Sequence, residues 1–405
     1  MNNPKNISIE DYHYNLPDEK IALFPCENRE ESKLLIYQNS TIQENTFKHI
    51  ADYLPSDGML VFNNTRVVQA RILFTKQTGS IIEIFCLEPL TPTSVHALAF
   101  EVKQQCQWEC FVGNNKRFNI PLELEFDYQG KKAILQTEKL GKHSDNSFRI
   151  RFSWQPSTLS FSEVLEHVGK IPLPPYIKRN AIDTDTERYQ TVFAKEKGSV
   201  AAPTAGLHFT ENIINQLIAK NIPIEYITLH VGAGTFKPVS SETIGEHDMH
   251  CEQLFFSEKT INHFLEKQNR KLIAVGTTTA RSLESLYWIG VKLHNKSNSP
   301  LHISQWEIYD DLSNKTLAVE QSLQTILNYM KTHQLEQLHA STSLMITPFY
   351  QPKMVKGIVT NFHQPKSTLL LLISAFVGEK WKDIYDYALS HDFRFLSYGD
   401  ACLFL

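Results

Sequence analysis

The later two thirds of the chain show one local pattern several times: an apolar run of strand length passes directly into a polar loop. Segments 222–229, 271–275 and 355–362 are the clearest cases, and the last two lead on into helical sequence. Strands that alternate with helices predict an α/β domain with a mostly parallel sheet. Loops that follow parallel strands meet at one edge of the sheet, so the sequence also predicts a functional site there.

The hydrophobic pattern of the sequence changes over about residues 67–155. Short runs that alternate apolar and polar residues are separated by turn-like clusters such as 78–80 and 113–115. Evenly spaced short strands with polar turns are typical of a small antiparallel barrel or sandwich. We therefore expect a larger α/β domain, residues 1–66 and 156–405, interrupted by an inserted small antiparallel β-barrel domain, residues 67–155.

Composition excludes several classes of protein. No uncharged apolar run reaches the roughly 18 residues that span a bilayer, and the N-terminus lacks the apolar stretch of a signal peptide. These features predict a cytoplasmic protein with no membrane partner. The net charge of −4 gives no overall basic field that would favour nucleic acid. Cys106 and Cys110 are the only close cysteine pair and lack a second pair for a zinc site, so we expect reduced, mostly buried thiols.

The segment 198–210, GSVAAPTAGLHFT, contains no charged residue but is rich in glycine and hydroxyl groups. Such a segment makes a poor helix or strand and a good rigid loop, whose backbone N–H groups can line a pocket. Similar loops recur at 230–235, 276–281 and 361–368, which suggests one composite site. Gly232 and Gly234 lack the third glycine of a dinucleotide fingerprint, so a Rossmann cofactor is rejected. The predicted ligand-binding residues of these loops are Thr204, Gly206, Gly232, Gly234, Thr235, Asn361 and Ser367.

Three threonines, Thr277, Thr278 and Thr279, stand between an apolar strand and a helix. Their hydroxyls and the free N–H groups of the helix N-terminus form a natural seat for a carboxylate or phosphate, and Arg281 adds a fixed charge. Plain helix capping is the alternative interpretation.

Histidines His208, His230 and His363 lie in the polar loops. A single histidine is more often structural than catalytic, but several that converge on one pocket indicate proton transfer, because imidazole titrates near neutral pH.

The sequence HDMHCE supplies His247, His250 and Glu252. It could be a metal cluster, but it lacks the helical spacing of a known zinc motif, and we expect no metal. Proton handling, ribose binding and a structural role remain open for it. Asp400, near the C-terminus, is either catalytic or a backbone cap.

These segments together resemble the S-adenosylmethionine:tRNA ribosyltransferase-isomerase family of the queuosine pathway. Two departures stand out: Phe349 replaces the glycine of a Pro-Gly-Tyr sequence, and the chain has extra length near 288–339. The resemblance extends over nearly the whole chain and is carried by residues 14–35, 60–72, 167–179, 188–210, 228–239, 247–252, 274–285, 360–376 and 397–405.

The resemblance implies a two-domain monomer that uses no cofactor and consumes S-adenosylmethionine as a co-substrate. Its ribosyl part would move to the aminomethyl group of a 7-deazaguanine at the tRNA wobble position, with loss of adenine and methionine, to give epoxyqueuosine. Three alternatives are a paralogue with a different RNA or nucleoside substrate, a non-catalytic tRNA-binding module, and a metal-dependent hydrolase that uses His247, His250 and Glu252.

Within that reaction, we expect His208 and His230 to act as base or acid, with His363 as the next candidate. Glycines 206, 232 and 234 would offer backbone donors, and Asp400 would read the deazaguanine edge. Residues 277–279 with Arg281 would hold the methionine carboxylate, while His250 and Glu252 would hold the ribose hydroxyls. The predicted tRNA contacts are Lys178, Arg179, Lys195 and Lys197, followed by Arg66 and Arg71.

Overall fold

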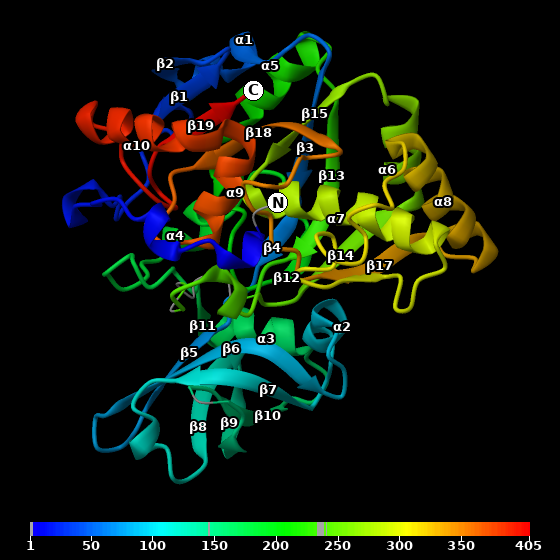
Figure 1. The fold of residues 1–405 in the computed structure, drawn as a ribbon. Helices are drawn as coiled ribbons and strands as arrows, with labels where there is room; N and C mark the ends of the chain where they lie inside the picture. Colours follow the sequence, from blue (N-terminus) through cyan, green and yellow to red (C-terminus); the bar gives the residue numbers. More distant parts are fainter. Residues whose placement is uncertain (1–2, 145, 233–238, 240) are drawn as a thin grey trace.

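The computed structural model describes residues 3–144, 146–232, 239 and 241–405, and it contains two sheets of different kinds (Figure 1). The larger sheet has ten strands in the order β16-β17-β14-β13-β3-β15-β18-β19-β1-β2. Its central strands β13, β3, β15 and β18 are mutually parallel. Their bounds, in that order, are Ile224–His230, Gly58–Asn63, Lys271–Val275 and Val355–Asn361. A largely parallel core confirms the α/β class that the strand–loop–helix pattern predicts.

The remaining strands extend this sheet on both sides. Strand β19 joins β18 in antiparallel pairing and β1 in parallel pairing. The antiparallel β14 and β17 continue the other side. The bounds of the outer strands are β1 Lys33–Gln38, β2 Thr41–Thr46, β14 Glu252–Ser257, β16 His302–Ile303, β17 Gln337–Thr342 and β19 Ala401–Phe404.

Alternate residues of each strand point to opposite faces of the ten-stranded sheet. Each face therefore has its own hydrophobic cluster, and helices cover both faces. Met59 and Val61 of β3 join one hydrophobic cluster, while Leu60 and Phe62 join another. The first cluster includes α6 Glu258–Glu266, α7 Thr277–His294, α8 Val319–Thr332, α9 Thr368–Val377 and α10 Trp381–Ser390. The second includes α1 Ile50–Tyr53 and α5 Glu211–Ala219.

The second sheet has seven strands, all antiparallel, in the order β11-β5-β6-β7-β10-β9-β8. Alternating burial along β7 places Trp108 in its core. Among the described residues, β11 and β8 each pair along one side, so the sheet is an open half-barrel. The bounds are β5 Arg71–Thr75, β6 Ile81–Thr91, β7 Gln105–Val112, β8 Leu122–Tyr128, β9 Lys131–Lys142, β10 Phe148–Gln155 and β11 Gly169–Lys170.

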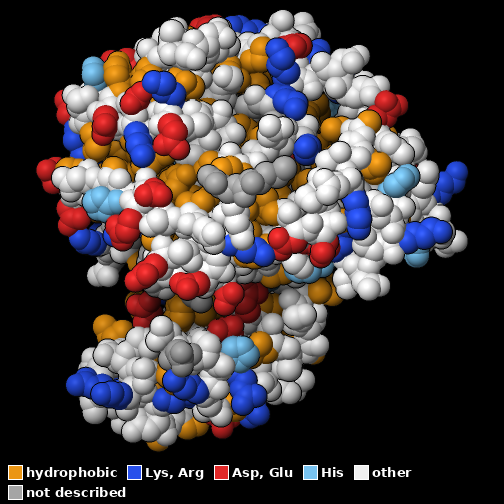
Figure 2. Space-filling model, viewed as in Figure 1, with side chains coloured by type: hydrophobic (Ala, Val, Ile, Leu, Met, Phe, Trp, Pro, Cys, Tyr) orange, Lys and Arg blue, Asp and Glu red, His pale blue; other side chains and the backbone are white. Residues whose placement is uncertain are grey.

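The half-barrel is inserted between β3 and β13 of the larger sheet, as expected. Its core also takes in α3, Phe161–Val168, and α2, His96–Phe100. The boundaries at 66/67 and 155/156 remain predictions. The parallel pair β4 Thr65–Val67 and β12 Glu196–Ser199 lies between the two sheets (Figure 1). The molecule narrows there, and Asp and Glu side chains gather over the junction on the face in Figure 2.

Three other features of the fold bear on the expectations. All six cysteines are free thiols; Cys106 and Cys110 are buried on β7, and burial raises the pKa of both. Phe349 is half-exposed at the surface. Within the described part of the chain, every helix is too short or too polar to cross a bilayer.

Candidate active site

A cavity of about 110 Å³ lies where β15 and β18 end and their polar loops begin. Its wall combines segments that are far apart in the sequence: 201–205, 276–278, 360–365, 367–369 and 396–397. Among the described residues that line it, none is Asp, Glu, Lys or Arg. Six of the predicted ligand-binding or catalytic residues line this cavity, namely Thr204, Thr277, Thr278, Asn361, His363 and Ser367.

Helix α7 points its N-terminus at the cavity. Gly276 precedes the helix with φ +95°, a backbone conformation that residues with side chains rarely adopt, and its N–H donates to Val359 O at 2.8 Å. Thr277 and Thr278 line the cavity, whereas the Thr279 hydroxyl turns back and donates to Val275 O at 2.8 Å. The turn therefore offers hydroxyls and free N–H groups to an anion.

A second helix begins at the same cavity. Ser367 is the N-cap of α9, and its side chain makes no capping bond; it donates instead to Gln364 O at 2.8 Å. Ser367, Thr368 and Leu369 all line the cavity. Two helix N-termini with hydroxyl groups thus face an uncharged space, and their dipoles favour a negatively charged ligand group.

His208 is buried behind the cavity wall, and both of its ring nitrogens are engaged. Nδ1 lies 2.8 Å from Ser32 Oγ, and Nε2 lies 3.0 Å from Asn361 Nδ2. Burial, together with the charges of Arg394 and Arg29, lowers its pKa to about 3. Asn361 lines the cavity, and its Oδ1 is buried without a partner among the described residues. His208 is therefore placed to orient Asn361, a residue of the cavity wall.

His363 lines the cavity itself. Thr360 Oγ1 lies 2.9 Å from His363 Nε2, which leaves Nδ1 as the ring nitrogen available to a ligand. Its backbone is fixed as well: the N–H donates to Tyr385 Oη at 3.0 Å, and Tyr14 Oη donates to its carbonyl. Burial lowers the pKa of His363 to about 3, so the ring is neutral at pH 7.

His230 ends β13 beside the cavity, but its neighbour Val231 is the residue that lines the wall. Its Nδ1 lies 3.0 Å from Thr65 Oγ1, and burial lowers its pKa to about 3. Gly198 makes room for the ring, because a Cβ at that position would lie 2.4 Å from His230 Cε1.

Glu252 and Arg281 form a buried ion pair away from the cavity lining. Arg281 Nη2 donates to Glu252 Oε2, and His250 Nε2 lies 3.3 Å from Glu252 Oε1. Burial alone would raise the pKa of Glu252, but Arg281 and His250 outweigh it and hold that pKa below its ordinary value. The charge of Arg281 is therefore matched within the protein.

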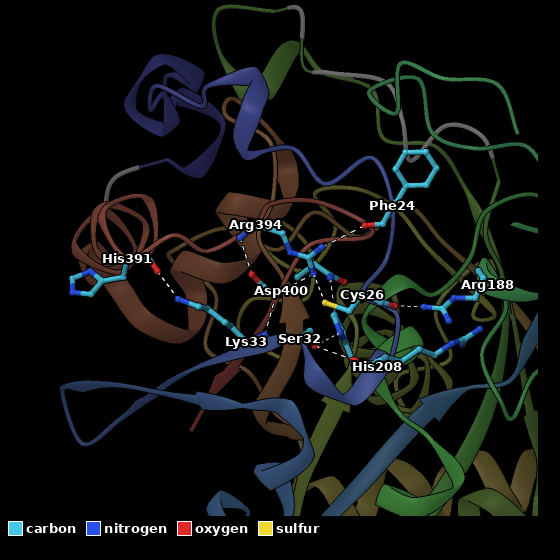
Figure 3. A network of polar contacts seen from close by, with 11 residues as sticks. Phe24, Cys26, Ser32, Lys33, Arg188, His208, His391, Arg394 and Asp400 are labelled. Carbon is cyan, nitrogen blue, oxygen red and sulfur yellow. Dashed lines mark hydrogen bonds and ion pairs between the residues drawn. The ribbon is translucent and has the colours of Figure 1, made fainter. Parts of the chain in front are cut away.

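Asp400 is a buried backbone cap in this structure (Figure 3). Its Oδ1 accepts the N–H of Lys33 at 2.9 Å, and its Oδ2 accepts the N–H of Arg394 at 2.7 Å. It holds β1 and the C-terminal segment together and does not line the cavity.

Of the predicted glycines, Gly206 and Gly232 are packed closely against neighbouring side chains, and Gly234 lies outside the described residues. A Cβ at Gly206 would lie 2.9 Å from Phe193 and Thr191 side-chain atoms, and one at Gly232 would lie 2.7 Å from Glu88 Oε1. Gly234 and Thr235 lie outside the described residues. Among the described residues, no group of three His, Cys, Asp or Glu side chains is arranged to hold a metal ion.

The basic residues predicted to bind tRNA mostly have acidic partners. The partner pairs are Lys178 with Asp18 at 2.6 Å, Arg179 with Asp185 at 2.7 Å, Lys195 with Glu196 at 3.9 Å, Lys197 with Glu166 at 2.6 Å and Arg71 with Glu83 at 3.5 Å. Arg66 is exposed on β4, opposite Lys197 of β12. Arg179 and Asp185 are the least exposed of these pairs, so that pair is structural.

The polar cavity residues that were not among the predicted site residues include Tyr176, Tyr189, Gln364 and Ser397. Tyr176 follows the proline-rich segment, and its hydroxyl lies 2.6 Å from Ser397 Oγ. Ser397 lies three residues before Asp400, which the sequence did single out. This proximity is only a weak indication that Ser397 belongs to the site. The tyrosines carry no motif, because an aromatic residue in a loop gives no indication of whether it lines a pocket.

The fold and cavity define an α/β protein with a polar, uncharged cavity at the carboxyl ends of parallel strands. A family model described as "Queuosine biosynthesis protein" matches residues 9–404. The chain belongs to this family.

Two known proteins are similar to the chain over nearly its whole length. The S-adenosylmethionine:tRNA ribosyltransferase-isomerase of Halothermothrix orenii is 36% identical over 406 residues, which cover 98% of this chain and 100% of the relative. The crystal structure of an S-adenosylmethionine tRNA ribosyltransferase from Thermotoga maritima shares 24% identity with a TM-score of 0.45, over 98% of this chain and 100% of that chain.

Proposed function

We propose that this chain is an S-adenosylmethionine:tRNA ribosyltransferase-isomerase. It moves the ribosyl part of S-adenosylmethionine onto 7-aminomethyl-7-deazaguanine at the tRNA wobble position and releases adenine and methionine. The observation that carries this proposal is the full-length relationship at 36% identity to an enzyme of that name. The cavity supports it, because neutral polar walls with two helix N-termini suit a ligand that bears both a carboxylate and a sulfonium.

The methionine carboxylate binds at the start of α7, with Thr277 and Thr278 as donors. Arg281 is already paired with Glu252, so the carboxylate depends on hydroxyls and backbone N–H groups. The sulfonium lies among uncharged walls, where the faces of Tyr176 and Tyr189 can stabilise a cation.

The first chemical step removes a proton from the carbon beside the sulfonium, and the positive sulfur stabilises the resulting ylide. His363 Nδ1 accepts this proton. The imidazole is neutral at pH 7, and the carboxylate that the substrate brings raises its pKa from the ligand-free value. His363 therefore takes the role for which His208, with both nitrogens engaged, has no free atom.

The later steps follow from the ylide. The ribose ring opens, adenine departs with a proton, and the amine of the deazaguanine adds to the vinyl sulfonium. The ylide that this addition regenerates closes on the aldehyde, and the alkoxide displaces methionine to form the epoxide. Asn361 Oδ1 is a ready acceptor for an amino group of the substrate in this sequence.

Two further features of the proposal concern the cell and the assembly. The proposed active unit is a monomer, as the resemblance to the family implies. A tRNA substrate supports a cytoplasmic location.

The deciding experiment incubates the protein with S-adenosylmethionine and a tRNA that carries the aminomethyl base. We expect stoichiometric adenine release and a nucleoside with the mass of epoxyqueuosine. Tight tRNA binding with no adenine release would favour a non-catalytic module. Loss of activity in EDTA would favour the metal-dependent alternative.

The matched variant is His363→Gln, which keeps a polar group in the cavity wall. Turnover should fall about 100- to 10,000-fold, the usual contribution of positioned proton transfer, while the KM for S-adenosylmethionine changes little. Wild-type turnover in this variant would remove His363 from the mechanism.

A further inference from the structure

A second, smaller cavity of about 20 Å³ adjoins the first, and Ser397 lines both. Three arginines line this second cavity: Arg29, Arg188 and Arg394. His208 contributes to its wall from the side opposite to Asn361. Figure 3 shows Arg188, Arg394, Cys26 and His208 turned toward one another across this space.

The second cavity is positively charged. Among the described residues that line it, none is Asp or Glu. Asp400, which follows the lining residue Gly399, accepts two backbone N–H groups and pairs with Arg394 Nη2 at 3.4 Å. The charges of Arg394 and Arg29 contribute to the low pKa of His208, after burial, which agrees with a local excess of positive charge.

Backbone carbonyls position Arg29 and Arg188 without neutralising them, whereas Arg394 forms an ion pair with Asp400 at 3.4 Å and donates to Cys26 Sγ at 2.7 Å. Arg29 Nη1 donates to Gln190 O at 2.5 Å, and Arg188 Nη1 donates to Glu27 O at 2.8 Å. Arg188 Nε is buried and has no partner among the described residues. A buried guanidinium N–H without a partner is costly, and an anion that reaches it would supply the missing acceptor.

Pro25 and Cys26 line the second cavity, and arginine side chains contact the two residues that precede them. Arg179 Nε donates to Leu23 O at 2.8 Å, and Arg394 Nη1 lies 3.4 Å from Phe24 O. Phe24 itself is 52% exposed, and the Arg179 guanidinium lies 4.2 Å from its ring centroid. An aromatic ring that is supported from one side and exposed on the other is a suitable surface for stacking a nucleobase.

We propose that the cavity formed by Arg29, Arg188 and Arg394 binds a backbone phosphate of the RNA substrate, next to a nucleobase that stacks on Phe24. This inference rests on the proposed function, since the acceptor base must reach the first cavity and its own phosphate must then lie nearby. The shared Ser397 places the two cavities side by side. Arginine is well suited to phosphate oxygens, because its planar fork donates two parallel hydrogen bonds.

The test uses the wild-type protein and an anticodon stem-loop RNA in which single loop phosphates are replaced by neutral methylphosphonates. One position next to the wobble base should lower kcat/KM for RNA about 10-fold or more in the wild-type protein. In Arg188→Gln and Arg29→Gln, the same replacement should have almost no further effect, because the partner charge is already absent. The salt dependence of log KM for RNA should become shallower by about one unit of slope in each variant.

Lys380→Gln, an exposed substitution on the far α10 region, is the matched control and should behave as wild type. Phe24→Ala should raise the KM for RNA about 10-fold and leave the KM for S-adenosylmethionine unchanged.

Equal sensitivity to every methylphosphonate position in wild type and variants would overturn the phosphate site. A rise in the KM for S-adenosylmethionine in the arginine variants would assign the cavity to the methionine carboxylate instead and overturn the RNA contact. Absence of adenine release from the wild-type protein with intact tRNA would refute the proposed function, a result distinct from these.

Discussion

Asn361 Nδ2 donates to His208 Nε2 at 3.0 Å, although the two residues are 153 positions apart in the chain. The bond joins the loop after β18 to the 3₁₀ turn Thr204–His208, and Ser32 holds the other side of the imidazole at 2.8 Å. His208 is thus placed to orient Asn361, whose remaining amide atom faces the cavity. This relationship gives the conspicuous histidine of the 198–210 motif a positioning role.

His208→Ala should lower kcat/KM for S-adenosylmethionine about 10- to 100-fold, because Asn361 then loses the bond that orients it. The test is a double-mutant cycle with Asn361→Ala. If His208 acts through Asn361, the double variant should be no worse than Asn361→Ala alone. Additive losses, with unchanged stability in urea, would show that His208 acts on the substrate independently.

Thr278→Val and Thr279→Val form a matched pair on α7. Thr278 lines the cavity, whereas the Thr279 hydroxyl donates to Val275 O. Thr278→Val should raise the KM for S-adenosylmethionine about 3- to 10-fold, the value of one lost hydrogen bond. Thr279→Val should leave that KM unchanged and lower the free energy of unfolding by about 1 kcal/mol. The reverse result would move the carboxylate away from the start of α7.

The buried ion pair between Glu252 and Arg281 should dominate stability at the edge of the site. Glu252→Gln leaves the Arg281 charge without its partner in a buried environment and should cost about 3–5 kcal/mol in urea unfolding. The double variant Glu252→Gln with Arg281→Met should be more stable than the sum of the single losses predicts. Strict additivity would contradict a direct pairing.

Acid should destabilise the protein through its buried histidines. Burial lowers the pKa of His208, His230 and His363 to about 3 and that of His96 to about 4. Between these values and the unfolded value of about 6.5, the unfolded chain binds protons that the folded chain does not. Burying these neutral histidines therefore costs no protonation free energy above about pH 6.5. The free energy of unfolding falls as the pH drops from there toward 3.

Each of these histidines contributes a slope of about 1.4 kcal/mol per pH unit within that window. The free energy of unfolding of His363→Gln, measured in urea at several pH values, should show a slope lower by that amount than wild type between about pH 4 and 6. Parallel slopes for the two proteins would show that His363 is protonated when folded.

The sequence was sufficient to predict the architecture, because hydrophobic periodicity is a local property. The apolar runs at 271–275 and 355–362 correspond to β15 and β18, and the polar residues after them lie at the cavity. The alternating runs of the insertion form the antiparallel strands of the inserted half-barrel, as expected.

The sequence also named six residues that line the cavity, since threonine, serine, asparagine and histidine side chains gather in its polar loops. It could not assign roles among the histidines. Whether a ring nitrogen is free depends on contacts such as Ser32 with His208 and Thr360 with His363, and the first of these joins distant segments.

The charge state of a predicted site residue was equally a tertiary property. Arg281 meets Glu252, and Asp400 meets the backbone N–H groups of Lys33 and Arg394, so neither offers its charge to the first cavity. The sequence thus determined which elements form and where polar loops gather. Only the folded structure decided which polar groups are satisfied by the protein and which are left for a ligand, because hydrogen bonds and burial depend on distances that local sequence does not encode.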